Sequence, residues 1–81
     1  MEKKDCVYIL ECNDGTLYTG WTNDIDKRFK AHNDGKGAKY TKGRRPLKLD
    51  YLEELETKSE ALKRENEIKK MTKDKKRQLI K

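Results

Sequence analysis

Five side chains of this 81-residue sequence stand out because both their type and their position would allow them to move protons, bind phosphate or hold a cation. They are spread along most of the chain: Tyr8, Tyr18, Arg28, His32 and Glu65. A phenol or an imidazole can accept and donate a proton, and a guanidinium can stabilise the charge of a pentavalent phosphate. A carboxylate can hold a hard divalent cation. Brought together, these groups would suit cleavage of a phosphodiester bond.

Arg28 and His32 lie in a segment whose pattern predicts a helix, capped by Asn23 and ending near Asn33. The apolar stripe of this helix is the pair Ile25 and Phe29, and Arg28 and His32 stand one turn apart beside it. Either the two polar residues serve a site, or the arginine stem covers Phe29 and the histidine is a solvated helix end.

Glu65 raises a similar question on a second predicted helix, over residues 57–71, which begins with the capping box TKSE. At about 100° per residue, Glu65 falls about 40° from Ala61, inside the apolar arc that Ile68, Ala61 and Leu62 define. A buried carboxylate needs a partner or a metal ion. Pairing with Lys69 four residues later is the structural alternative, and position alone does not separate the two.

The two tyrosines lie on a predicted β-hairpin, with strands CVYILEC (6–12) and TLYTGW (16–21) around the turn NDG. Gly15 can supply the left-handed residue of a three-residue loop. That loop pairs Cys12 with Thr16 and Tyr18 with Leu10, which places Tyr8 and Tyr18 on one face of the sheet. A two-residue loop would place them on opposite faces.

The remaining elements complete an α+β prediction. Pro46 opens a third strand over 47–56, in which Leu47, Leu49 and Tyr51 alternate, and Thr72 caps a short final helix over about 72–80. We therefore expect a three-stranded antiparallel sheet flanked by helices in the order β-β-α-β-α-α. Residues 1–81 are expected to form one domain, with the chemistry-bearing core at about 6–70.

Composition sets limits on this prediction. Charged residues make up 44% and hydrophobic residues 32%, but the apolar residues follow strand and helix periods, which favours a folded chain. No stretch is long and apolar enough for a membrane span, and the N-terminal residues lack a signal-peptide pattern. Cys6 and Cys12 are too far apart in one strand for a disulfide. We expect a cytoplasmic monomer with reduced cysteines.

The positive charge is concentrated in one segment. Residues 36–49 hold 6 basic and no acidic side chains, which equals the net charge of +6 of the whole chain. Cations around an aromatic residue suit phosphate contacts and base stacking. The alternative is a solvated loop that aids solubility. The candidate nucleic-acid contacts are Lys36, Lys39, Tyr40, Lys42, Arg44 and Arg45.

The stretch CVYILECNDGTLYTGWTNDIDKRFKAH resembles the opening of a GIY-YIG nuclease domain of the small stand-alone bacterial branch. Tyr8 matches the tyrosine that ends the first motif, and Tyr18-Thr19-Gly20 matches the second. SEALKRENEIKK resembles the family segment that carries a metal-binding glutamate. Four positions depart from the family. Cys6 and Val7 replace the glycine and isoleucine of the first motif, Thr19 stands in the middle of the second motif, and Trp21 stands where some relatives carry lysine. The asparagine that many relatives carry later in the chain has no counterpart after Asn66.

The resemblance implies a DNA endonuclease, a hydrolase that acts in DNA repair or recombination and uses one Mg²⁺ or Mn²⁺ ion. Glu65 would hold the ion, Arg28 would neutralise charge on phosphorus, and Tyr8, helped by His32, would accept a proton from water. Tyr18 would position the water or the phosphate. DNA is expected in preference to RNA. The alternative is a nucleic-acid-binding module that has the nuclease fold without turnover, which the small size of the chain favours.

Overall fold

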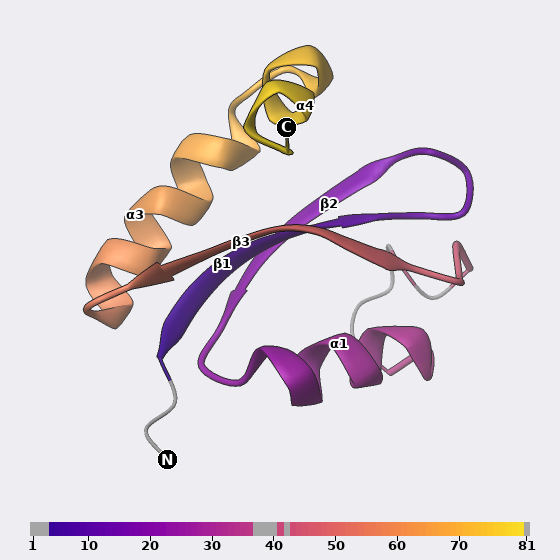
Figure 1. The fold of residues 1–81 in the computed structure, drawn as a ribbon, viewed down its shortest axis with the longest axis horizontal. Coiled ribbons are helices and arrows are strands. Elements are labelled where there is room, and N and C mark those ends of the chain that lie inside the picture. Colours follow the sequence, from indigo (N-terminus) through magenta and orange to yellow (C-terminus); the bar gives the residue numbers. More distant parts are fainter. Residues whose placement is uncertain (1–3, 37–40, 42, 81) are drawn as a thin grey trace.

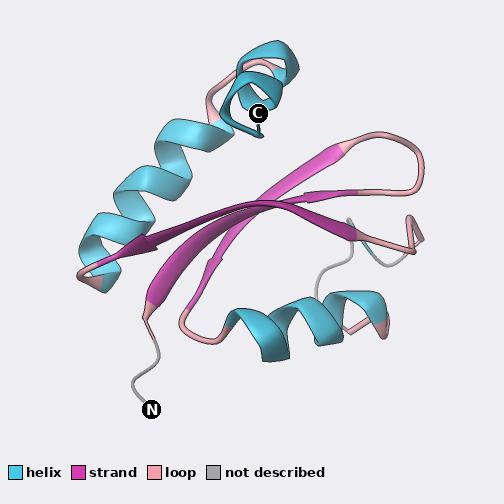
Figure 2. Cartoon of the chain, in the orientation of Figure 1, coloured by secondary structure: helices cyan, strands magenta, loops and turns pink. Residues whose placement is uncertain are grey.

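A computed structural model describes residues 4–36, 41 and 43–80 of the chain. Within those residues the order of elements is β-β-α-β-α-α, as predicted, and the three strands form an antiparallel sheet in the order β2-β1-β3. Figures 1 and 2 show the sheet with helices on both sides. The elements are β1 (Asp5–Glu11), β2 (Leu17–Thr22), α1 (Ile25–Asn33), β3 (Lys48–Leu55), α3 (Lys58–Lys69) and α4 (Lys73–Ile80).

The β1–β2 hairpin has the predicted register. Leu10 pairs with Tyr18, and the Cys12 amide donates to the Thr16 carbonyl oxygen at 2.8 Å. Gly15 has a φ of 85°, the left-handed conformation that the three-residue loop requires. Because side chains alternate along a strand, this register places Tyr8 and Tyr18 on the same face of the sheet, which confirms the prediction.

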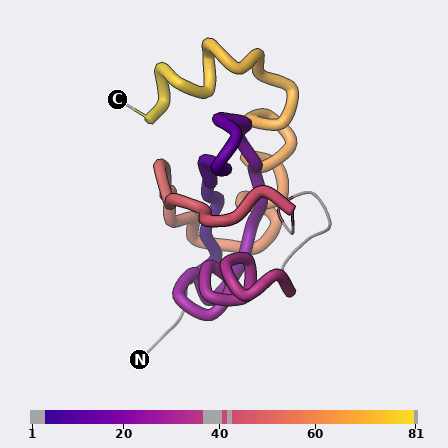
Figure 3. The backbone as a smooth tube through the Cα atoms, turned by 90° about the vertical axis from the view of Figure 1, so that its right-hand side faces the viewer, coloured from indigo at the N-terminus to yellow at the C-terminus, as the bar shows by residue number. Residues whose placement is uncertain are grey.

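The sheet separates two apolar clusters. On one face, Tyr8 and Leu10 of β1 pack with Ile25 and Phe29 of α1. On the other face, Val7 and Ile9 of β1 pack against α3 and α4, through residues that include Ala61, Ile68, Leu79 and Ile80. A view turned by 90° shows α1 at the bottom and α4 at the top, with the strands between them (Figure 3). The central strand is therefore covered on both faces, which explains its continuous apolar run.

The predicted alternation of Leu47, Leu49 and Tyr51 is wrong at Tyr51. In β3, Leu10 pairs with Leu49 but Ile9 pairs with Tyr51, so Asp50 is an extra residue that forms a β-bulge. Leu47 and Leu49 pack on the α1 side, whereas Tyr51 packs on the α3 side. Side chains alternate between the two faces of a strand, so one added residue moves every later side chain to the opposite face.

One of the three predicted helix caps is also wrong. Asp24, not Asn23, caps α1, and its side chain accepts a hydrogen bond from the Lys27 amide. Thr57 caps α3 by accepting from the Glu60 amide, as predicted. The Lys75 amide donates to Thr72 Oγ1 at 3.2 Å at the start of α4, as predicted.

The ends of two elements differ slightly from the expected ones. Helix α3 ends at Lys69, two residues before the predicted end, and Lys70 is its C-cap. The third strand begins at Lys48 and not at Leu47. Cys6 and Cys12 are free and buried, as predicted. None of the helices in the described ranges has the length and apolar character needed to cross a membrane.

Candidate active site

The centre of the candidate site is a hydrogen bond between Tyr8 of β1 and His32 of α1. Tyr8 Oη lies 3.0 Å from His32 Nε2, and both residues are buried, with exposed fractions of 2% and 1%. His32 follows Ile25 and Phe29 at helical spacing, so the apolar stripe that attaches α1 to the sheet carries the imidazole with it. The alternative of a solvated helix end is therefore wrong for His32.

The second ring nitrogen of His32 is also hydrogen-bonded. His32 Nδ1 lies 2.9 Å from the hydroxyl oxygen of Thr41, a residue with an exposed fraction of 0%. Thr41 belongs to the basic segment 36–49, and nothing in the sequence marked it as a site residue. Its contact depends on how that segment folds back onto α1, which local periodicity does not describe.

Tyr18 completes an aromatic group around His32. Its ring centroid lies 5.3 Å from that of His32 and 6.4 Å from that of Tyr8. Gly20 makes this arrangement possible, since a Cβ atom at that position would lie 2.6 Å from Tyr8 Oη. The glycine of the second motif therefore accommodates the phenol of the first.

Arg28 lies one turn before His32 and is exposed. It lines a surface cavity of about 280 Å³ with residues from the end of β2, the connection to α1 and α1 itself: Thr22, Asn23, Asp24, Lys27 and Ala31. Its positive charge reaches the site electrostatically, because it helps to lower the pKa of His32 and opposes the rise in the pKa of Tyr8.

The environment keeps both proton-carrying groups neutral. Burial, followed by the Arg28 charge, lowers the pKa of His32 below its ordinary value. Burial is also the main reason why the pKa of Tyr8 is raised, with smaller contributions from Tyr18 and Glu65 that outweigh Arg28. A neutral imidazole beside a neutral phenol can pass a proton along the hydrogen bond between them.

Glu65 lies on α3, on the far side of the sheet from α1. Ala61 and Ile68, which flank it on the helix, have exposed fractions of 0%, and the Glu65 side chain is 14% exposed. Its carboxylate lies 3.4 Å from Lys69 Nζ, so the predicted structural pairing is present. Glu65 acts on the aromatic group electrostatically, because its charge contributes to the raised pKa of Tyr8.

Two further features of β2 belong to this side of the sheet. Thr19 Oγ1 is buried and has no hydrogen-bond partner among the described residues, and Thr19 pairs with Ile9, which packs against α3. Lys58 Nζ of α3 lies 5.1 Å from the ring centroid of Trp21. A cation from α3 therefore stands beside the position where some family members carry lysine.

The donor set around Glu65 fits a hard cation only if the substrate completes the coordination. No group of three or more His, Cys, Asp or Glu side chains suited to a metal ion occurs within residues 4–36, 41 and 43–80. Mg²⁺ commonly binds one or two carboxylates and takes its other ligands from phosphate and water. A single, slightly exposed carboxylate satisfies that pattern, and Lys69 would compete with the ion for it.

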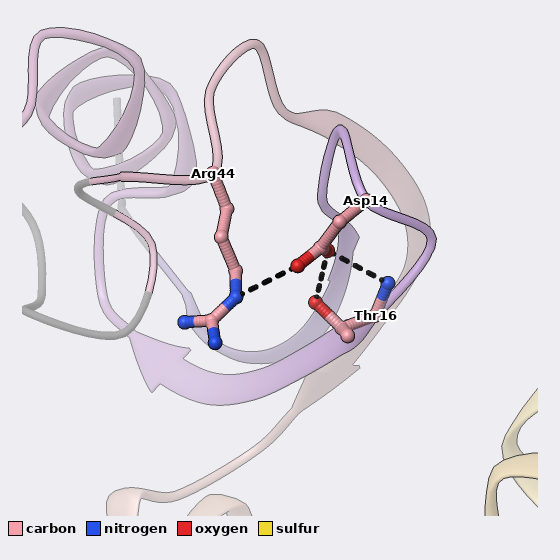
Figure 4. Close-up of polar contacts among 3 residues, drawn as sticks. All are labelled: Asp14, Thr16 and Arg44. Carbon is pink, nitrogen blue, oxygen red and sulfur yellow. Dashed lines mark hydrogen bonds and ion pairs between the residues drawn. The ribbon is translucent and has the colours of Figure 1, made fainter.

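The described part of the basic segment is attached to the rest of the protein. Arg44 Nε donates to Asp14 Oδ2 at 3.0 Å, and Thr16 donates to Asp14 Oδ1 from both its amide and its hydroxyl (Figure 4). These bonds, first those from Thr16 and then that from Arg44, lower the pKa of Asp14. Arg45 donates to the Asn33 carbonyl oxygen at 3.3 Å. Lys36 is exposed, whereas Lys39, Tyr40 and Lys42 lie outside the described residues.

The sheet, the helix order and the tyrosine–histidine centre define a GIY-YIG nuclease-type domain. The GIY-YIG catalytic domain family is matched over residues 4–78, and the chain belongs to this family. A UPF0213 protein of Clostridium perfringens is 62% identical over 74 residues, which cover 91% of this chain and 80% of that protein. A UPF0213 protein of Syntrophus aciditrophicus is 62% identical over 96% of this chain and 91% of its own length. The chain is thus similar to small stand-alone bacterial proteins.

Two solution structures have a similar fold. A UPF0213 protein of Bacillus halodurans has a TM-score of 0.62 and 49% sequence identity, and the match covers 95% of this chain and 82% of that one. A protein of E. faecalis has a TM-score of 0.66 and 41% identity, with 96% and 85% covered. These comparisons confirm the predicted family and fold class.

Proposed function

We propose that the protein is an endonuclease that depends on a divalent metal ion and hydrolyses phosphodiester bonds in DNA. The observation that carries this proposal is the buried 3.0 Å contact between Tyr8 Oη and His32 Nε2, within electrostatic reach of Arg28. A neutral proton acceptor next to a permanent cation is what in-line attack of water on a phosphodiester requires.

In the proposed reaction, the oxygen of a water molecule forms a bond to phosphorus while the bond from phosphorus to the leaving oxygen breaks. The Tyr8 oxygen takes the proton of the water, and the Tyr8 proton moves to His32 Nε2. The leaving oxygen takes a proton from solvent. His32 suits the acceptor role because its lowered pKa keeps it unprotonated at neutral pH.

Arg28 and Tyr18 would meet the phosphate from the exposed side of the site. Arg28 is exposed, so a phosphate oxygen can reach it at the protein surface. Its charge would stabilise the pentavalent state. Tyr18 is half-buried and lies next to both Tyr8 and His32, which suits a phenol that positions the attacking water.

Glu65 would hold one Mg²⁺ or Mn²⁺ ion, which when bound supplies positive charge to the phosphate and the leaving oxygen. The basic segment 36–49, with Lys36, Arg44 and Arg45 in its described part, would supply phosphate contacts, and DNA is favoured over RNA. Two buried free cysteines agree with a cytoplasmic site of action. We also propose that residues 1–81 act as one domain and as a monomer.

The test is Glu65→Gln, compared with Glu67→Gln on the same helix. Glu67 is a suitable control because its side chain is 65% exposed and its ion pair, with Arg64, is long at 3.9 Å. Glu65→Gln should abolish cleavage in Mg²⁺, leave DNA binding nearly unchanged and alter the metal-free melting temperature little, because glutamine keeps the volume and removes the charge. Glu67→Gln should cleave as the wild type does.

Substrates for this test should include single-stranded, duplex, nicked and branched DNA and matched RNA, each with and without Mg²⁺ or Mn²⁺. Full cleavage by Glu65→Gln, in a preparation free of contaminating nuclease, would remove Glu65 as the metal ligand. Absence of cleavage by the wild type on every substrate, with binding retained, would contradict the catalytic proposal.

A second candidate function is a nucleic-acid-binding module without turnover. The 3.4 Å ion pair between Glu65 and Lys69 favours it, because that pair already compensates the carboxylate without a metal ion. Binding that requires no divalent ion, together with the absence of cleavage, is the outcome expected of this candidate.

A further inference from the structure

We propose that Thr41 is a positioning residue that holds His32 in the tautomer with the proton on Nδ1, so that Nε2 stays available to accept the Tyr8 proton. This inference rests on the proposed function for its catalytic meaning, but the tautomer itself can be measured without any cleavage. The contact that carries it is the 2.9 Å separation between His32 Nδ1 and Thr41 Oγ1.

His32 stands between two hydroxyl groups inside the protein. Tyr8 Oη lies 3.0 Å from Nε2 and Thr41 Oγ1 lies 2.9 Å from Nδ1, and none of the three residues is more than 2% exposed. A neutral imidazole has one N–H donor and one acceptor nitrogen. One hydroxyl must therefore donate to the ring while the other accepts from it.

The chemistry of the two hydroxyls selects one of these arrangements. The phenol of tyrosine is much more acidic than the aliphatic hydroxyl of threonine, so it is the better donor. The phenolic oxygen shares a lone pair with its ring and is therefore the poorer acceptor. The stronger pair of hydrogen bonds has Tyr8 donating to Nε2 and Nδ1 donating to Thr41 Oγ1.

This arrangement connects the basic segment to the proposed chemistry. Thr41 belongs to residues 36–49, in which the candidate phosphate contacts lie. With Thr41 in place, the imidazole cannot turn about its side-chain bonds without losing a buried hydrogen bond, which is costly in a dry interior. The segment that is proposed to contact DNA thereby also orients the proton acceptor.

The experiment uses the fact that the chain has 1 histidine. With ¹⁵N-labelled full-length protein at neutral pH, a long-range ¹H–¹⁵N spectrum reports the protonation of both ring nitrogens of His32 without assignment ambiguity. The wild type should show a protonated Nδ1 and an unprotonated Nε2. A wild-type spectrum with the proton on Nε2 would overturn the proposal, and this measurement needs no variant.

Thr41→Val and Thr41→Ser then separate the hydroxyl from the side-chain volume. The valine variant keeps the shape and lacks the acceptor, so a population with protonated Nε2 should appear. Its kcat should fall by about 10- to 100-fold with little change in KM, the size of loss typical for hydrogen-bond partners of metal-binding histidines. The serine variant keeps the hydroxyl and should restore both the spectrum and the rate.

Two outcomes separate this inference from the proposed function. A valine variant with the wild-type tautomer and the wild-type rate would overturn the role of Thr41 and leave the nuclease proposal intact. The expected tautomers in all three proteins, with no cleavage by the wild type, would support the role of Thr41 in orienting His32 and contradict the nuclease proposal.

Discussion

Gly20 leaves the space that the Tyr8 phenol occupies, which explains why the second motif contains glycine. A Cβ atom at position 20 would lie 2.6 Å from Tyr8 Oη and 2.8 Å from Tyr8 Cζ. The phenol cannot move aside freely, because it is buried and hydrogen-bonded to His32. The motif glycine is thus a requirement of packing between two strands.

Gly20→Ala should therefore displace Tyr8 from His32 and lower the free energy of unfolding by about 1–3 kcal/mol, a typical cost of overpacking. Urea denaturation measures this change. Gly43→Ala is the control, because a Cβ atom at Gly43 meets nothing within 4 Å. Equal stability of the two variants would show that the hairpin adjusts without cost.

His32 gives the stability of the protein a predictable pH dependence. Burial lowers its pKa in the folded state, whereas the unfolded chain has the ordinary value of about 6.5. As the pH falls below about 6.5, the unfolded state gains a proton that the folded state does not bind, so the free energy of unfolding decreases. The stabilisation from neutral His32 is fully present above that pH.

The expected result is a steeper loss of stability in the wild type than in His32→Gln between about pH 7 and pH 5. Urea denaturation across this range gives both slopes, and the difference between them isolates the histidine from the carboxylates that titrate in both proteins. Parallel curves would mean that His32 titrates alike in the folded and unfolded states.

At the scale of elements, the start of α1 sets the position of Arg28 and His32. Asp24 accepts from the Lys27 amide, and Thr22 Oγ1 accepts from the Asp24 amide at 3.1 Å. Asn23 and Asp24 are both good capping residues by type, and the prediction from the sequence took Asn23. Which of the two takes the non-helical conformation of a cap depends on where β2 ends.

Asp24→Ala should cost about 1 kcal/mol of stability, because it removes the cap, whereas Asn23→Ala should cost less. Thermal unfolding of the two variants measures the difference. If Asn23→Ala were the more damaging change, Asn23 and not Asp24 would be the functional cap.

The bulge in β3 is the second feature at this scale. Asp50 is the inserted residue, and its carboxyl group interacts with that of Glu11 on β1. Burial first, and then Glu11, raises the pKa of Asp50, while the same interaction lowers the pKa of Glu11. The bulge thus allows β3 to contribute Leu49 to one core and Tyr51 to the other.

For the molecule as a whole, the sheet divides the proposed catalytic groups. Tyr8, Tyr18 and His32 meet on the α1 side, and Arg28 lies within electrostatic reach of them. Glu65 comes from α3 on the other side of the sheet. Tyr8 Oη lies over Gly20 of the edge strand β2. The charges of Arg28 and Glu65 both affect the pKa of Tyr8. We therefore expect bound substrate to lie across the β2 edge of the sheet.

The net charge of +6 predicts binding of nucleic acid that depends on salt. Replacing Arg44 and Arg45 together by alanine should weaken DNA binding and reduce the slope of log K against log salt by about 1 to 2, which corresponds to one or two lost phosphate contacts. Fluorescence anisotropy at several salt concentrations measures both quantities.

The control for this pair is Lys63→Ala with Lys70→Ala, which removes the same charge from exposed positions on and just after α3. Asp14→Asn completes the set, because it removes the ion pair of Arg44 without changing the arginine. An unchanged slope in the double-arginine variant would show that Arg44 and Arg45 make no phosphate contacts and would favour a role of the basic segment in solubility.

The sequence by itself determined the features that are local in origin. Strand and helix periods predicted the element order, and the loop NDG with Gly15 determined the hairpin register, so Tyr8 and Tyr18 could be assigned to one face. The motif residues and the family followed from short segments whose spacing is preserved in the chain. These predictions succeed because each depends on residues within a few positions of one another.

Only the tertiary structure decided the features that depend on distant segments. The bond from Thr41 to His32, the bulge at Asp50 that turns Tyr51 to the α3 side, and the placement of α1 and α3 on opposite faces all arise from packing. No local sequence pattern predicts these features. Hydrophobic burial is non-directional, so it requires that an apolar face be covered but does not determine which segment covers it.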